Sequence, residues 1–80
     1  METDKTMEIT IKLFATLRNE LFDEEKREIS KDATIGEVIR DLNIPGNQVT
    51  LILLNGRHAW PDTKLNDGDT LSLFPPIGGG

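Results

Sequence analysis

The chain has 80 residues, a formal net charge of −5, no cysteine, and hydrophobic residues at 36% of its positions. This length suits one small domain with one core and leaves no room for a separate substrate-binding domain. The lack of cysteine excludes a thiol nucleophile and a cysteine-ligated metal, and the single histidine, His58, excludes a histidine-rich metal site. The acidic charge disfavours nucleic acid as a partner and favours a basic protein.

The ends of the chain and its hydrophobic runs bear on location. No hydrophobic run approaches the ~20 residues that span a bilayer, and residues 1–6 lack the basic and apolar stretches of a signal peptide. We therefore expect no membrane partner, and the lack of cysteine favours a reducing, cytoplasmic setting. We predict that residues 1–6 form a flexible N-terminal arm, with Met7 as an alternative start.

The first part of the chain predicts two strands. Hydrophobic and polar residues alternate over residues 8–14, which is typical of a half-buried strand. Residues 15–22 predict a turn or a short helical segment, and residues 23–25 a charged, solvated loop. Residues 26–30 predict the second strand.

One amphipathic helix follows. Ile35, Val38, Ile39 and Leu42 have the spacing of a single buried helical face. Thr34 and Glu37 form a capping-box pattern at its start, and residues 43–46 contain the proline and glycine that end it.

The second half predicts three strands. Residues 48–54 are hydrophobic on both faces, and Asn-Gly at 55–56 is a strong hairpin signal that leads into a return strand over residues 57–60. A tight turn at 67–69 precedes the last strand over residues 70–74, which two prolines end. The order is ββαβββ or close to it, so we predict the α+β class: a mixed sheet covered on one face by a single main helix.

Four segments resemble the molybdopterin synthase small subunit and sulfur-carrier protein family (MoaD/ThiS-like). They are Phe-Ala-Thr-Leu-Arg at 14–18, Thr-Ile-Gly-Glu-Val at 34–38, Leu-Asn-Gly at 54–56, and the run Asp-Gly-Asp-Thr-Leu-Ser-Leu-Phe-Pro-Pro-Ile-Gly-Gly-Gly at 67–80. The last is the most specific, and it departs from the family only at Gly78, where alanine is common. The resemblance implies a ubiquitin-like β-grasp over residues 7–74, followed by a flexible, glycine-rich tail at 75–80.

The resemblance also implies a function. The chain would not be catalytic alone but would be the sulfur-donating small subunit of molybdopterin synthase, in molybdenum cofactor biosynthesis. An E1-like adenylating enzyme would activate Gly80 with ATP, sulfur would replace AMP to leave a thiocarboxylate, and the tail would enter the large subunit. No cofactor is expected on the chain itself. The alternatives are a sulfur carrier for another pathway (thiamin, cysteine or tungsten cofactor), a ubiquitin-like protein modifier, and an interaction module with a disordered tail.

The tail residues have properties that suit threading into a narrow channel. Glycines lack a Cβ, the prolines stiffen the base of the tail, and the segment from residue 75 to 80 can extend to roughly 20 Å. Besides Gly80, the threading residues are Pro75, Pro76, Ile77, Gly78 and Gly79. A frayed terminus or a cloning remnant is the simpler alternative.

A second candidate feature is an apolar patch on the sheet. Phe14 and Phe74 alternate onto the face opposite the helix, and Ile52 and Leu54 are predicted to join them. Because one helix cannot cover both faces, these four residues predict a docking surface for the activating enzyme and the large subunit. Ordinary coverage by loops is the alternative.

The remaining polar and aromatic residues have simple structural explanations. Asp67 and Asp69 flank Gly68 and fit turn chemistry better than a metal site, so we expect no metal. Arg57, His58 and Trp60 fit solvent-facing positions on an edge strand better than a ligand pocket.

Overall fold

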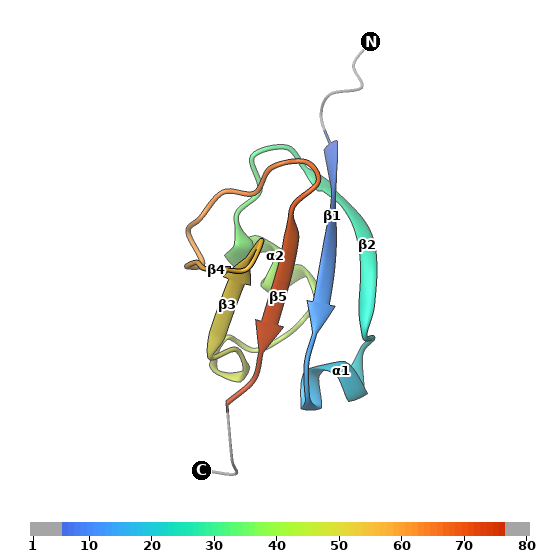
Figure 1. Cartoon of the computed structure of the whole chain (residues 1–80), viewed down its shortest axis with the longest axis vertical. Helices are drawn as coiled ribbons and strands as arrows, with labels where there is room; N and C mark the ends of the chain where they lie inside the picture. The colour runs from blue at the N-terminus through green and yellow to red at the C-terminus, as the bar shows by residue number, and fades with distance from the viewer. Residues whose placement is uncertain (1–5, 77–80) are drawn as a thin grey trace.

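The computed structural model describes residues 6–76. A five-stranded sheet has the strand order β2-β1-β5-β3-β4, and α2 lies across one of its faces (Figure 1). This is the α+β, β-grasp arrangement that we predicted. The elements are β1 (Thr6–Leu13), α1 (Thr16–Glu20), β2 (Glu24–Ser30), α2 (Ile35–Asp41), a 3-10 helix (Gly46–Gln48), β3 (Leu51–Leu54), β4 (Arg57–His58) and β5 (Thr70–Phe74).

The central strand pair joins the two ends of the domain. β5 runs parallel to β1 on one side and antiparallel to β3 on the other, while β2 and β4 add antiparallel at the two edges. The sheet is therefore mixed, as predicted. Because β5 lies between two strands, the chain beyond Phe74 leaves from the middle of the sheet (Figure 1).

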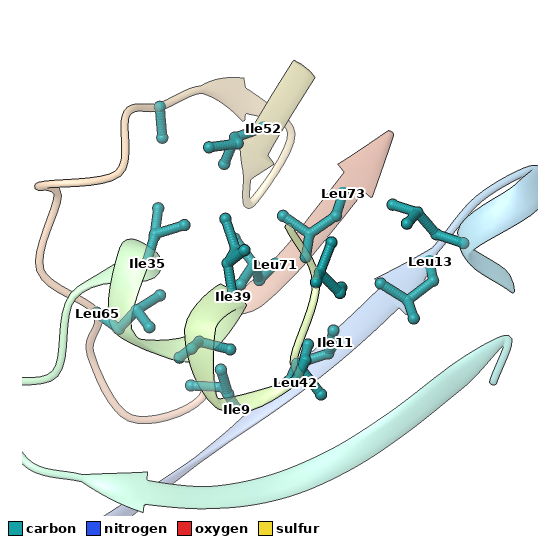
Figure 2. Packing of buried hydrophobic residues seen from close by; sticks show 14 of the residues in the cluster. Ile9, Ile11, Leu13, Ile35, Ile39, Leu42, Ile52, Leu65, Leu71 and Leu73 are labelled. Carbon is teal, nitrogen blue, oxygen red and sulfur yellow. The ribbon is translucent and has the colours of Figure 1, made fainter. Parts of the chain in front are cut away.

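The core fills the space between α2 and the sheet. Side chains from β1, β5 and α2 point toward one another there (Figure 2). Their burial removes apolar surface from water, which is the main force that holds so small a domain together. The largest fully buried side chains are Ile9, Ile11, Leu13, Ile35, Leu71 and Leu73.

Both ends of α2 are capped, the start by the predicted capping box and the end by a motif that was not predicted. Thr34 and Glu37 form the full capping box, each side chain accepting from the other residue's backbone N–H. At the other end Asn43 has φ 61°, and Ile44 N–H donates to the Ile39 carbonyl at 3.2 Å. This is a Schellman ending, with an asparagine tolerating the left-handed conformation.

Several element boundaries differ from prediction, including the ends of β1 at Leu13 and of β4 at His58, where we predicted Phe14 and Trp60. β1 already includes Thr6, which we had assigned to the N-terminal arm, and residues 1–5 lie outside the described range. β2 includes Glu24 and Glu25, predicted as loop, because they pair with β1. β3 begins only at Leu51, because the preceding residues form the 3-10 helix.

The β3–β4 hairpin forms at the predicted dipeptide. Asn55 and Gly56 have φ values of 52° and 84°, which is the pair of positive values that a tight two-residue turn requires. Among the helices of residues 6–76, none has both the length and the hydrophobicity to cross a membrane.

Candidate functional site

The end of β5 is held on both sides by backbone hydrogen bonds. Thr50 N–H donates to the Phe74 carbonyl at 2.8 Å, and Phe14 N–H donates to the Leu73 carbonyl at 3.3 Å. Pro75, predicted as the first residue of the flexible tail, is buried against the domain, whereas Pro76 is exposed. The other tail residues, Ile77, Gly78, Gly79 and Gly80, lie outside the described part of the chain.

Phe14 and Phe74 stack on each other where β1 and β5 end. Their ring centroids are 4.2 Å apart and the planes are inclined by 9°. The preceding residues, Leu13 and Leu73, are paired and buried toward α2. Since side chains alternate along a strand, the two phenylalanines lie on the opposite face, half-buried, as predicted.

The placement of Ile52 and Leu54 on this face was wrong. Ile52 pairs with the buried Leu73 and is itself only 7% exposed, and Leu54 packs against the same core. Figure 2 shows Ile52 pointing toward the core. The cause is the register of β3 against β5, which turns the even-numbered residues of β3 toward α2.

Leu51 and Leu53 lie on the face opposite α2, where we had predicted Ile52 and Leu54. Leu51 pairs with Phe74 and is 36% exposed, and Leu53 lies on the same face opposite Ser72. Periodicity could not identify them, because both faces of this strand are hydrophobic. We call Phe14, Leu51, Leu53 and Phe74 the outer patch.

An aromatic pair continues the outer patch toward the β4 edge. His58 pairs with Leu53, and its ring centroid lies 4.8 Å from that of Trp60. Arg57 and His58 are exposed, and Trp60 is 58% exposed. The prediction that these three residues face solvent is confirmed. Only Arg57 and His58 lie on the edge strand, however, because β4 ends at His58 and not at Trp60 as predicted.

Strained backbone lies next to the outer patch. Ala15, directly after Phe14, has φ 55° and ψ −128°, a combination that glycine adopts far more readily than alanine. Its carbonyl accepts hydrogen bonds from the N–H groups of Arg18 and Asn19 at the start of α1. The strained turn thus reverses the chain immediately after the stacked phenylalanine.

The acidic turn before β5 has the structural role that we predicted. The Asp67 carboxylate accepts from Glu8 N–H at 2.8 Å, and the buried Asp69 carboxylate accepts from Asn66 N–H at 2.8 Å. Within residues 6–76 no three acidic, histidine or cysteine side chains come together in a way that could hold a metal ion.

The tail begins next to the outer patch. A partly exposed apolar patch on a sheet face suits another protein surface better than a small molecule, since small ligands bind in concave sites. The match to the ThiS family extends over residues 11–80. The chain belongs to the ThiS family.

Proteins similar to this ThiS-family chain include a small archaeal modifier protein and a subunit of a molybdopterin-converting factor. Small archaeal modifier protein 3 of Haloferax volcanii is 33% identical over 92% of this chain and 100% of its own length. The solution structure of the Haloferax volcanii HVO 2177 protein has a TM-score of 0.82 and 31% identity, covering 100% of this chain and 92% of that one. A complex of subunits 1 and 2 of the molybdopterin-converting factor from Helicobacter pylori contains a chain with a TM-score of 0.59 and 28% identity, covering 92% of this chain and 100% of that one.

These likenesses confirm the predicted fold and family. The ThiS-family chain is a ubiquitin-like β-grasp protein. It is a small ubiquitin-like protein of the sulfur-carrier or modifier type.

Proposed function

We propose that this protein carries sulfur as a thiocarboxylate on Gly80 and supplies it to molybdopterin synthesis. The observation that carries the proposal is the position of the outer patch at the end of β5, beside the prolines that begin the tail. A partner that covers the outer patch also receives the chain end next to it. The family match, which reaches residue 80, supports this use of the terminus.

The first chemical step would be activation by an E1-like enzyme. The Gly80 carboxylate attacks the α-phosphorus of ATP, and pyrophosphate leaves. This step is needed because a free carboxylate is a poor electrophile. Hydrosulfide then attacks the acyl carbon, the bond from that carbon to the AMP oxygen breaks, AMP leaves, and a thiocarboxylate remains. ATP is thus used by the partner and not held by this chain.

The second step would take place in a large synthase subunit. The tail would enter that subunit's pocket, where the thiocarboxylate sulfur would bond to a carbon of a pterin precursor and displace an oxygen leaving group. Water would then attack the acyl carbon, the acyl C–S bond would break, and Gly80 would return to a carboxylate, with the large subunit supplying the catalysis. The Helicobacter pylori complex supports this assembly, since it pairs subunit 1 of a molybdopterin-converting factor with subunit 2. The outer patch is the docking surface that we assign to both partners.

Intact-mass measurement tests the sulfur step directly. Protein isolated from its own cells, or incubated with ATP, a sulfur source and an activating enzyme, should gain about 16 Da at Gly80, because sulfur replaces oxygen. Fragment mapping must place the gain at Gly80, since oxidation adds a similar mass at Met7 or Trp60. Deletion of Gly80 should abolish the gain and leave thermal unfolding unchanged. A deleted chain that still acquires sulfur would exclude the proposal.

Protein modification is the second candidate, and the 33% identity to a small archaeal modifier protein favours it. The activation step is the same, but a lysine amine of a target then attacks the acyl carbon and forms an isopeptide bond as AMP leaves. Peptide mapping would find the chain's C-terminal glycines attached to target lysines. Sulfur loading without such adducts would favour the carrier role, and adducts without sulfur delivery to the synthase would favour the modifier role.

A further inference from the structure

β2 is an open edge strand. It has seven residues, pairs with β1 on one side only, and no described strand lies along its other side (Figure 1). Leu13 N–H donates to the Asp23 carbonyl at 3.0 Å, so the odd-numbered residues of β2 direct their backbone groups toward β1. The N–H and C=O groups of Glu24, Lys26 and Glu28 therefore point outward. Such a row is a template for another strand.

The charges beside this edge are unbalanced on the face away from α2. Glu28 lies directly opposite Glu8 of β1, and like charges in such a pair repel. Glu28 accepts a hydrogen bond from the Thr6 hydroxyl at 2.7 Å. Lys26, two residues away on the same face, lies opposite the uncharged Thr10. Among residues 6–76, neither the Glu28 carboxylate nor the neighbouring Lys26 ammonium group takes part in an ion pair.

We propose that β2 pairs with β2 of a second copy of this chain. In an antiparallel arrangement centred on Arg27, all seven residues of the strand overlap. Even-numbered residues then oppose even-numbered residues, as the outward-pointing backbone groups require. The five strands of each copy join into one continuous sheet.

The charges select this register. Lys26 of each copy lies opposite Glu28 of the other, so two ammonium groups reach the two carboxylates that Glu8 repels. Shifting the centre to Lys26 instead would bring Glu25 opposite Arg27 twice, but it would also oppose Glu24 with Glu28 twice and Lys26 with Lys26. Three repulsive pairs would then replace the single one between the two Arg27 side chains. Edge strands often carry charge to prevent pairing. Here, however, the charges at positions 26 and 28 of β2 are complementary to those of a second β2 strand that runs antiparallel to it.

The face toward α2 accommodates the two Arg27 side chains that meet at the symmetry axis. The Glu25 carboxylate already lies 3.3 Å from the Arg27 guanidinium in each copy. A groove of about 590 Å³ lies between β2 and α2, and on the α2 side it is lined by the acidic residues Asp32, Glu37 and Asp41 and the basic residues Arg27, Lys31 and Arg40. The two guanidinium groups therefore have space and counter-charge.

Sedimentation equilibrium from low micromolar to millimolar concentration tests the proposal with the full chain. The wild type should show a weak, concentration-dependent monomer–dimer equilibrium, because one strand edge is a small interface. Lys26→Glu and Glu28→Lys should each weaken dimerisation at least about tenfold, since both cross-strand pairs become repulsive. An equimolar mixture of these two variants should dimerise again, because both pairs between positions 26 and 28 of unlike copies are then attractive.

Two further variants separate the β2 edge from other causes. Lys64→Glu makes the same charge change on an exposed side chain outside β2 and should leave the dimer unchanged. Leu51→Ala alters the outer patch and should also leave it unchanged. A wild type that stays monomeric, equal weakening by Lys64→Glu, or failure of the mixture to dimerise would overturn the proposal. None of these measurements depends on sulfur loading.

Discussion

The Asn55 side-chain amide donates to the Asp69 carboxylate at 2.9 Å and so joins the β3–β4 hairpin to the turn before β5. The Asn55 side-chain oxygen also accepts from Thr70 N–H at 2.9 Å, and the second Asp69 oxygen accepts from Asn66 N–H. One buried carboxylate therefore satisfies donors from two turns that are far apart in the sequence. This end of the sheet lies opposite the end where the chain exits toward the tail (Figure 1).

Asp69→Ala should lower the free energy of unfolding by about 2 kcal/mol, because it removes the acceptor of two part-buried hydrogen bonds, from the Asn55 amide and from Asn66 N–H. Asp67→Ala is the matched control, since Asp67 is exposed and its carboxylate accepts from Glu8 N–H. Its cost should be about 1 kcal/mol or less. Urea unfolding with an unchanged m-value measures both. Equal losses in the two variants would show that burial of Asp69 adds nothing.

Ala15→Gly should raise the free energy of unfolding by about 1 kcal/mol, because glycine adopts the observed φ and ψ without strain. Ala59→Gly is the control: Ala59 is buried and is not among the positive-φ residues. There the added flexibility of the unfolded chain should cost about 0.5–1 kcal/mol. Thermal unfolding of the pair should give shifts of opposite sign, and a loss at both positions would contradict the strain at Ala15.

Gly36→Val should destabilise the protein by about 1–3 kcal/mol through overpacking. A Cβ at this position would lie 3.2 Å from the Pro61 carbonyl oxygen, to which Gly36 N–H also donates at 2.8 Å. The neighbour is backbone, so it yields little. Gly46→Ala is the control, since nothing lies within 4 Å of its added Cβ; it should be neutral or stabilising by about 0.5 kcal/mol. The denaturant midpoints of the two variants measure these changes in stability. If Gly36→Val leaves the midpoint unchanged, the loop at Pro61 moves freely.

The features that the sequence predicted correctly depend on neighbours in the chain. The capping box of Thr34 and Glu37 and the positive φ values of Asn55 and Gly56 are set within a few residues. The features that were missed depend on distant pairing. The start of β2 was hidden because Glu24 and Glu25 are charged, and only their pairing with β1 shows them to be strand.

The orientation of β3 at the candidate site also depends on distant pairing and could not be predicted from the sequence. Its residues are hydrophobic on both sides, so alternation alone does not say which side meets the core. The register with β5 decides, and that register joins residues about twenty positions apart. The Asn55–Asp69 contact could not be predicted either, because turn chemistry alone already accounted for the residue type at each position.

Leu51→Ala and Ile52→Ala should separate the docking surface from the core at adjacent positions. Ile52 is 7% exposed, so its truncation should cost about 2–4 kcal/mol of stability. Leu51 is 36% exposed, so its loss should cost under about 1 kcal/mol. With an activating enzyme in hand, Leu51→Ala should lower kcat/KM for ATP-dependent adenylation by about tenfold, chiefly through KM, because a central apolar contact is removed.

Ile52→Val is the control for adenylation, because it trims the core by one methyl group and leaves the outer patch unchanged. It should adenylate at the wild-type rate below its unfolding temperature. Pyrophosphate exchange measures activation, and urea unfolding measures stability on the same samples. If Leu51→Ala is stable and adenylated normally, the activating enzyme does not bind at Leu51. If Ile52→Val lowers adenylation as much as Leu51→Ala, the effect comes from the core and not from the outer patch.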